Sequence, residues 1–220
     1  AVKKFGVKVI IKKNLCIIHG SGIDGYKYKK NITINAGNSG TLARLILGIL
    51  INSKKEIKII GDKSLSKRDF SRVTNPLAIF GANIASNKKK LPVKIKGSEF
   101  LRPIIFNERL GSAQCKSSVM LAAIKTPGKT IIKAKKSRNH TELIFKYLNI
   151  PIKILRKNNY DFIEIDGPAN FKGFDYKIPG DLSSSSFFLV LTLLANKSKL
   201  LIKNVNVNSS RTGIIKILNK

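Results

Sequence analysis

The chain of 220 residues is 43% hydrophobic and 7% aromatic, which is enough to bury a core in one large or two small domains. Its longest apolar run, residues 187–195, is shorter than the about 20 residues that a membrane span needs, and its start lacks a targeting pattern, so we expect a cytoplasmic protein. The net charge of +30 comes mostly from lysines scattered over the whole length, without an aromatic RNA-binding platform, which argues against a dedicated nucleic-acid-binding protein.

Hydrophobic periodicity predicts a regular order of elements along the chain. Residues 1–5 read as the end of a helix that stops at Gly6, and two strands follow, at residues 7–11 and 15–18. The next elements are a helix near residues 42–50, a strand at 56–60, a helix at 70–80 and a strand pair at 82–85 and 92–96. The same order then recurs as a strand at 103–106, a helix at 117–124, a strand at 129–134, a helix at 140–148 and a strand pair at 151–155 and 160–165. A third unit begins with a strand at 176–178, a helix at 187–195, a strand at 200–205 and a helix from Thr212 onward.

Each unit therefore has the order β-α-β-α-β-β, and the unit is repeated. Residues 117–124 and 187–195 are apolar nearly all round, which is typical of helices buried on every side. Strands such as residues 93–96 alternate between apolar and charged side chains and can show one face to water. We predict an α/β fold with helices inside and sheets outside, the reverse of a doubly wound fold.

Three loops of small polar residues open apolar helices at intervals of roughly 70 residues. These loops span residues 35–41, 110–114 and 179–186. Free backbone N–H groups and the positive end of a helix dipole favour anions at such places, so the loops are candidate anion sites. An arginine also precedes the second helix of each unit, at positions Arg68, Arg138 and Arg211. The alternative is that these arginines are solvated loop charges or hold neighbouring units together.

Six segments, in this order, resemble the enolpyruvyl transferase family and, within it, the 5-enolpyruvylshikimate-3-phosphate (EPSP) synthases. The segments are NAGNSGTLAR (35–44), GDKSLSKRDFSRV (61–73), GSAQCKSSVMLAA (111–123), SRNHTE (137–142), PGDLSSSSFFLV (179–190) and NSSRTG (208–213). The resemblance implies an inside-out α/β barrel of two domains that close over shikimate 3-phosphate and phosphoenolpyruvate. It also implies transfer of the enolpyruvyl group from phosphoenolpyruvate to shikimate 3-phosphate with release of phosphate, without a cofactor, in aromatic amino acid biosynthesis.

The resemblance assigns the chain to part of such an enzyme. Residues 1–178 match the shikimate 3-phosphate-binding domain, with an incomplete first unit and two full units, and residues 179–220 match the hinge and the first part of a truncated second domain. A Lys-Ser…Arg segment is expected before Ala1, and the acid/base carboxylates are expected after Lys220. We therefore expect a fragment that is inactive alone, from an enzyme that is monomeric when complete.

The resemblance also implies roles for individual residues. The positions that match ligands of shikimate 3-phosphate are Ser112, Ala113, Gln114 and Ser137. The positions that match ligands of phosphoenolpyruvate are Gly40, Arg68 and Gln114. Many relatives carry a second Ser where this chain has Ala113, so one side-chain hydrogen bond fewer is expected. A side chain at Gly40 would crowd the ligand against the backbone.

Other residues in the matched segments are expected to be structural. Arg44 and Asp181 are expected to hold the loop and the domain hinge, and His140 to serve at a helix start. Cys16 and Cys115 lie far apart in apolar surroundings, and the chain has only two histidines, so neither a metal site nor a disulfide is expected.

Two alternatives remain at this point. UDP-N-acetylglucosamine enolpyruvyl transferase shares the implied fold and co-substrate, but it usually carries a reactive Cys in the loop equivalent to residues 61–68, where this chain has none. The other alternative is a non-catalytic basic repeat module that binds nucleic acid, which a steep loss of DNA affinity with salt would support.

Overall fold

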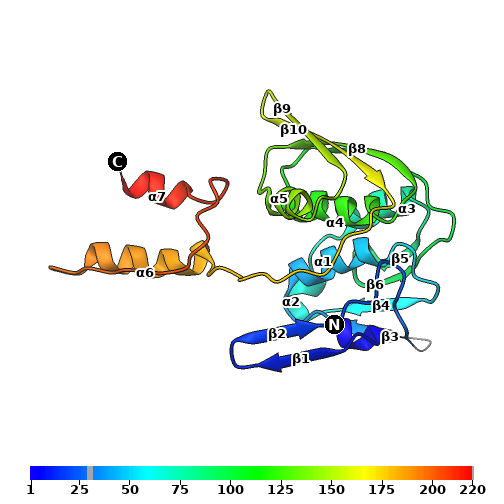
Figure 1. Cartoon of the computed structure of the whole chain (residues 1–220), viewed down its shortest axis with the longest axis horizontal. Coiled ribbons are helices and arrows are strands. Elements are labelled where there is room, and N and C mark those ends of the chain that lie inside the picture. The colour runs from blue at the N-terminus through cyan, green and yellow to red at the C-terminus, as the bar shows by residue number, and fades with distance from the viewer. Residues whose placement is uncertain (29–31, 220) are drawn as a thin grey trace. The chain divides into compact units, whose positions relative to one another are not determined.

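A computed structural model describes residues 1–28 and 32–219 of the chain (Figure 1). The chain forms two compact units, Ala1–Lys172 and Gly173–Lys220. The sequence places the domain boundary after residue 178, and the division into two functional domains stays a prediction.

The N-terminal segment forms a short 3₁₀ helix, η1 (Val2–Phe5), and an antiparallel sheet of β1 (Val9–Lys12) and β2 (Leu15–Ile18). Gly6 ends η1 in the left-handed conformation, with φ at 75°, which a residue without Cβ adopts at no steric cost. The predicted helix end and strand pair are confirmed. Cys16 on β2 is exposed among apolar neighbours in the sequence, whereas Cys115 is buried.

The first four-stranded sheet has the strand order β3-β4-β6-β5, with β3 and β4 parallel and the other neighbours antiparallel. Its strands are β3 (Ile32–Asn35), β4 (Ile57–Ile60), β5 (Asn83–Asn87) and β6 (Lys90–Lys96). Its helices are α1 (Gly40–Ile49), α2 (Lys63–Ser66) and α3 (Ser71–Ile79). The predicted elements of this unit are confirmed, and the one-turn helix α2, which is too short to show a period, is an addition to them.

The second four-stranded sheet repeats this topology, with the order β7-β8-β10-β9 and a parallel pair of β7 and β8. Its strands are β7 (Ile105–Glu108), β8 (Gly128–Lys135), β9 (Ile152–Lys157) and β10 (Tyr160–Gly167). Its helices are α4 (Ala113–Ala123) and α5 (His140–Tyr147). The start of α4 was predicted at Ser117, but the side chain of Ser112 caps the helix and brings its start forward to Ala113.

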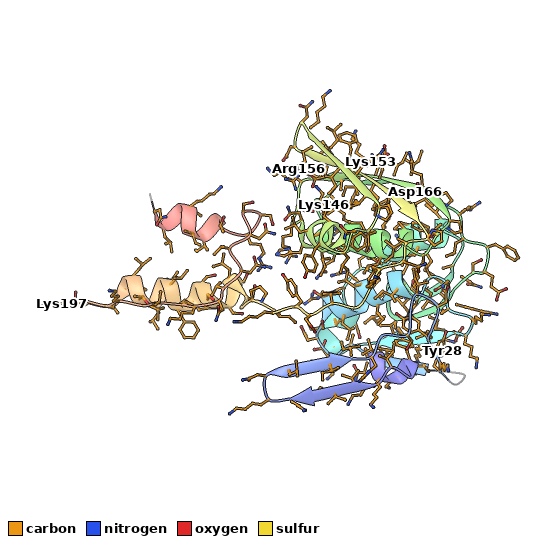
Figure 2. All side chains as sticks on the ribbon, viewed as in Figure 1. Tyr28, Lys146, Lys153, Arg156, Asp166 and Lys197 are labelled. Carbon is orange, nitrogen blue, oxygen red and sulfur yellow. The ribbon has the colours of Figure 1, made fainter. Side chains whose placement is uncertain are left out.

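Within residues 1–172, the helices α1, α3 and α4 lie between the two four-stranded sheets, and side chains fill the space between the layers (Figures 1 and 2). Helix α4 is buried along most of its length, as its all-round apolar sequence predicts. Lys153 and Arg156 on β9 belong to the outer layer (Figure 2). The prediction of helices inside and sheets outside is therefore confirmed for this unit.

Helices α1 and α4 pack closely against each other in the middle of the layer. Gly48 on α1 allows this approach, because a Cβ atom at this position would lie 2.2 Å from the carbonyl oxygen of Ser118. The hydroxyl of Ser118 in turn donates a hydrogen bond of 2.8 Å to the carbonyl oxygen of Arg44. Since the two helices come from successive units of the repeat, this contact joins the repeats to one another.

The second unit contains α6 (Leu182–Leu194) and α7 (Gly213–Leu218). The predicted strands at residues 176–178 and 200–205 are wrong, since the described residues 173–219 contain a single isolated bridge, between Gly180 and Val205. Burial of α6 on every side is also wrong: Leu182 is its one buried residue, and Phe187 is 79% exposed. An all-round apolar helix needs neighbours on every face, and in this unit α6 is accompanied by α7 and loops.

Across residues 1–28 and 32–219, no helix has both the length and the apolar character to span a membrane.

Candidate functional site

The first pair of parallel strands brings two loops together at one sheet edge. The N–H of Ala36, just after β3, donates to the carbonyl oxygen of Ile60 at the end of β4, at 2.8 Å. The N–H of Asp62 then donates to the carbonyl oxygen of Gly37 at 2.9 Å. The side chain of Asn38 donates to the Asp62 carboxylate at 2.5 Å. Residues 36–41 and 61–68 are therefore held as one loop pair, which we call the first loop pair.

Each of these loops contains the capped start of a helix. Ser39 Oγ accepts from the N–H of Leu42 at 3.1 Å and caps α1, and Asp62 Oδ1 accepts from the N–H of Leu65 at 2.7 Å and caps α2. The bond from Leu65 and the bond from Asn38 lower the pKa of the Asp62 carboxyl below its ordinary value. The first turn of α1 thus lies in a loop pair that is rich in backbone and side-chain donors.

The structure brings Gly40 and Arg68, two of the residues predicted to bind phosphoenolpyruvate, together. Gly40 is buried at the start of α1, and a Cβ atom there would lie 3.2 Å from Nη1 of Arg68 and 3.2 Å from Nη1 of Arg44. The two guanidinium groups therefore flank the glycine. Two like charges at such a place favour an anion between or beside them.

Gln114, the third residue predicted for this ligand, joins the same group from α4. Nη1 of Arg44 donates to Oε1 of Gln114 at 2.6 Å, and Nε2 of Gln114 donates to Oγ1 of Thr41 at 2.7 Å. The orientation of the amide is fixed by these two bonds. The Arg44 guanidinium also lies 5.3 Å above the ring of Phe70.

Arg44 is thus more than a loop support, which is the role expected from the sequence. Burial lowers the pKa of the Arg44 guanidinium, and the positive charges of Arg68 and Arg72 act in the same direction. Nearby Cys115 and Asp69 oppose this effect. The sequence offered one signal for the bridge between Arg44 and Gln114, namely that both lie near the start of a helix in successive repeats.

A second loop pair follows β7 and β8, which are also parallel neighbours. Glu108 at the end of β7 pairs with Ala134 in β8, and its carboxylate accepts from the N–H groups of Leu110 and Gly111, at 3.2 and 2.6 Å. The loop after β7 leads to Ser112 and α4, while the loop after β8 carries Ser137. The carboxyl ends of parallel neighbours lie at one sheet edge, so Ser112 and Ser137 follow adjacent strand ends.

Besides Gln114, three residues are predicted to bind shikimate 3-phosphate, and they differ in the hydrogen bonds that their side chains make. Ser112 Oγ caps α4 by accepting from the N–H of Cys115 at 3.3 Å, and it also contacts Cys115 Sγ at 3.2 Å. Ala113 is half-buried in the first turn and offers no side-chain hydrogen bond. Ser137 Oγ is buried and makes no hydrogen bond to residues 1–28 or 32–219.

The predicted residues thus form two groups that α4 connects. Gly40, Arg68 and Gln114 belong to the first loop pair, and Ser112 and Ser137 belong to the second. Ser112 and Gln114 lie in the same first turn of α4, so the groups share a helix start. No hydrogen bond joins Ser137 Oγ to Gly40 or Arg68 in the described part of the chain.

The third small-residue loop belongs to the second unit and is described by itself. Asp181 caps α6 by accepting from the N–H of Ser184 at 3.2 Å, and Arg211 lies 3.1 Å from the same carboxylate. Arg211 also bonds the hydroxyl of Ser183. These contacts support the structural role expected for Asp181.

Comparison with known proteins agrees with this arrangement. The family model described as EPSP synthase (3-phosphoshikimate 1-carboxyvinyltransferase) matches residues 1–220. The 3-phosphoshikimate 1-carboxyvinyltransferase of Caldicellulosiruptor saccharolyticus is 40% identical over 222 residues, which cover 98% of this chain and 50% of the relative. The protein of the same name from Vesicomyosocius okutanii subsp. Calyptogena okutanii is 41% identical over 217 residues, which cover 98% of this chain and 49% of the relative.

Solved structures point to the same fold. EPSP synthase from Acinetobacter baumannii matches with a TM-score of 0.84 and 32% sequence identity, over 99% of this chain and 48% of that chain. The chain spans about half the length of the curated relatives that it matches. The structural match confirms the predicted α/β fold class, and the family match extends over residues 1–220, so the chain belongs to the EPSP synthase family.

Proposed function

We propose that this chain forms the shikimate 3-phosphate-binding part of a 3-phosphoshikimate 1-carboxyvinyltransferase, a monomeric cytoplasmic enzyme when complete. In this proposal residues 1–178 bind shikimate 3-phosphate and one side of phosphoenolpyruvate, and residues 179–220 begin the second domain. The observation that carries the proposal is the cluster of Arg68, Arg44 and Gln114 around Gly40, at the start of α1. Two guanidinium groups and a fixed amide at a helix start form a site for an oxyanion.

The chemistry of the two substrates fits such a site, because both carry phosphate and carboxylate groups. Phosphoenolpyruvate would lie beside Gly40, where the guanidinium of Arg68 can bind an oxyanion through two parallel hydrogen bonds. The phosphate of shikimate 3-phosphate would accept from the hydroxyl of Ser137, which otherwise stays buried and unbonded, at a cost of about 1–3 kcal/mol. Ser112 and Gln114 would add contacts to it from the first turn of α4, with one fewer at Ala113.

The proposed reaction is an addition followed by an elimination. The ring hydroxyl oxygen of shikimate 3-phosphate bonds to C2 of phosphoenolpyruvate, its proton is lost and the methylene carbon gains a proton. The tetrahedral intermediate then loses a methyl proton and expels phosphate, which restores the double bond. The part of this chain in that scheme is to gather, orient and desolvate the anions, while the acid and base groups are unassigned.

The alternatives have less support from the site. The loop of residues 61–68 contains no thiol, and Cys115 is buried behind Ser112, so the thiol associated with the UDP-N-acetylglucosamine enzyme has no counterpart. The lysines that a nucleic-acid-binding module would need are spread over both sheets.

Calorimetry on the 220-residue chain tests the proposal. We expect shikimate 3-phosphate to bind and UDP-N-acetylglucosamine not to bind, and we expect Arg68→Ala to weaken the binding of phosphoenolpyruvate added to the shikimate 3-phosphate complex. Arg102→Ala serves as a matched control, since Arg102 is an exposed arginine whose Nε donates to the carbonyl oxygen of Ile79. Equal binding of shikimate 3-phosphate and UDP-N-acetylglucosamine, or of neither, would contradict the proposed substrate.

A further inference from the structure

A buried ammonium group contacts two carboxylates behind the candidate site. Lys116 on α4 is 0% exposed, and its Nζ lies 2.5 Å from Oε1 of Glu142 and 3.6 Å from Oδ2 of Asp161. The side chains of Glu142 and Asp161 are themselves 2% and 5% exposed. Arg156 adds a second positive charge from the surface, with Nε 3.4 Å from Oδ1 of Asp161. Two positive and two negative charges thus balance, three of them out of water.

Such a cluster is a costly way to stabilise a core. Removing charges from water costs several kcal/mol for each ion, and apolar residues of similar volume often stabilise a fold equally well or better. Lys116 Nζ and the Glu142 oxygens make no hydrogen bond of regular geometry among the described residues, so the cluster acts through charge, and buried charges fix the register of the elements that carry them in some proteins. The position of these charges in the chain therefore indicates which elements are held.

The three buried charges lie on elements that adjoin the segment carrying Ser137 in the chain or in the sheet. Residues 136–139 connect β8 to α5, and Glu142 lies in the first turn of α5, just after this segment. Asp161 pairs across the sheet with Ala134 of β8, just before the segment. One ammonium group therefore contacts a residue that follows the connection, Glu142, and a residue of the strand paired with β8, Asp161.

Lys116 also belongs to the helix start that the candidate site shares. It follows Gln114 by two positions in α4. The next residue, Ser117, forms a hydrogen bond of 2.6 Å with the hydroxyl of Thr141 in α5. Within the segment, the N–H of Lys136 donates to the carbonyl oxygen of Asn159 at 2.8 Å. The segment is thus hydrogen-bonded at its first residue, Lys136, and the helix that follows its last residue, α5, is joined to α4.

We infer that Lys116 is a positioning residue, which uses Glu142 and Asp161 to fix the hydroxyl of Ser137 relative to Ser112 and Gln114. This inference rests on the proposed function, in which these residues bind shikimate 3-phosphate. Binding depends on the spacing of donors, and a displacement of about 1 Å can cost up to about a hundredfold in a reaction that depends on it. Loss of the contacts of Lys116 with Glu142 and Asp161 should therefore weaken ligand binding, although every group that contacts the ligand is still present.

The decisive variant is K116M/E142L, which replaces one ion pair with apolar side chains of similar size and leaves Asp161 with Arg156. It removes one positive and one negative charge, so the net charge that attracts an anion is unchanged. We expect the urea unfolding midpoint to be kept and the Kd for shikimate 3-phosphate, measured by calorimetry, to rise about tenfold or more. The control K129M/E164L removes a half-exposed pair of 3.5 Å in the same sheet and should change neither quantity.

Unchanged affinity in a folded K116M/E142L would overturn the inference. If this variant does not fold, E142Q keeps the side-chain shape and the contact between Lys116 and Asp161, and a Kd equal to that of the wild type would overturn it as well. If the wild-type chain does not bind shikimate 3-phosphate, the proposed function fails. Amide hydrogen exchange then tests whether Lys116, Glu142 and Asp161 hold residues 136–139 in place. Exchange at residues 136–139 should be about tenfold faster or more in K116M/E142L, with the first sheet unchanged, and equal rates would refute the positioning role.

Discussion

Replacing Gly48 with alanine should destabilise the fold, even though alanine is the better helix former. Gly48 is the next-to-last residue of α1 and packs against α4. A Cβ atom at this position would lie 2.2 Å from the carbonyl oxygen and 3.0 Å from the carbonyl carbon of Ser118. Ordinary van der Waals contact begins at 3.4 Å, so the two helices would have to separate by about 1 Å.

The expected size of the effect follows from three contributions. Alanine in place of glycine stabilises a helix interior by about 1 kcal/mol, which is an upper bound for Gly48 near the end of α1. Overpacking a dense interior costs about 1–3 kcal/mol, and occasionally more. Separation of the helices also weakens the bond from the Ser118 hydroxyl to the carbonyl oxygen of Arg44, 2.8 Å long, which is worth about 1 kcal/mol. We expect a net loss of about 1–3 kcal/mol in the free energy of unfolding for G48A.

The matched control is the same substitution at Gly40, the first residue of the same helix. A Cβ atom there would meet the ends of two flexible side chains, Arg44 and Arg68, each at 3.2 Å. G40A should therefore keep its stability while displacing the guanidinium groups and weakening phosphoenolpyruvate binding.

Urea unfolding followed by circular dichroism compares the two variants with the wild type at pH 7. A G48A variant as stable as the wild type, with an unchanged m-value, would refute the close approach of α1 and α4. A G40A variant that loses stability but binds phosphoenolpyruvate normally would show that Gly40 serves the fold and not the site.

Two further outcomes follow from buried polar groups. Ser137→Ala should keep or raise the unfolding midpoint, because Ser137 Oγ has no hydrogen-bond partner in the described part of the chain, yet calorimetry should show about tenfold weaker binding of shikimate 3-phosphate, the worth of a hydrogen bond to a charged group. A lower midpoint with unchanged affinity would contradict this role. Burial lowers the pKa of Lys125 to about 8 from the ordinary 10.5, so the unfolded chain binds more protons between these pH values and stability rises with pH there. The wild-type free energy of unfolding minus that of K125M should rise by about 3 kcal/mol from pH 8 to pH 10.5 in urea titrations, and a flat difference would count against burial of the amine.

The elements of residues 1–172 could be predicted because apolar spacing is a local property. The strand at residues 15–18 and the helix at 140–148 follow from the nature of their own side chains, and the structure places them at Leu15–Ile18 and His140–Tyr147. The start of α4 depends on the side-chain cap at Ser112, which apolar periodicity does not reveal. In residues 173–219, strands were predicted from apolar runs alone. A strand forms only where a neighbouring strand can pair with it by backbone hydrogen bonds, and the local sequence does not show whether such a neighbour exists.

The candidate site was predictable as a set of residues but not as a set of contacts. The small-residue loops were predicted as anion sites because helix starts have a sequence signature, and the family resemblance singled out Gly40, Ser112 and Gln114 within them. The bond between Arg44 and Gln114 joins residues 70 positions apart, and no spacing rule fixes which side chain of one repeat reaches the next. The buried charge of Lys116 was equally hidden, since a lysine in an apolar helix start reads as a solvated residue until its partners are placed.

The lysine-rich composition and the candidate anion site are separate electrostatic properties of this chain. Lys58 and Lys94 face each other across the first sheet in solvent, and Lys94 also pairs with Glu56 at half exposure. Charges of this kind act over a Debye length of about 8 Å at physiological salt and attract any anion without choosing its orientation. Arg44, by contrast, lies over an aromatic ring and is bonded to Gln114, so its guanidinium has one direction in which to meet a ligand. In the proposed function, selective recognition of a phosphate ester depends on the few fixed guanidinium and hydroxyl groups, and adding salt should weaken nonspecific anion binding far more than binding at this site.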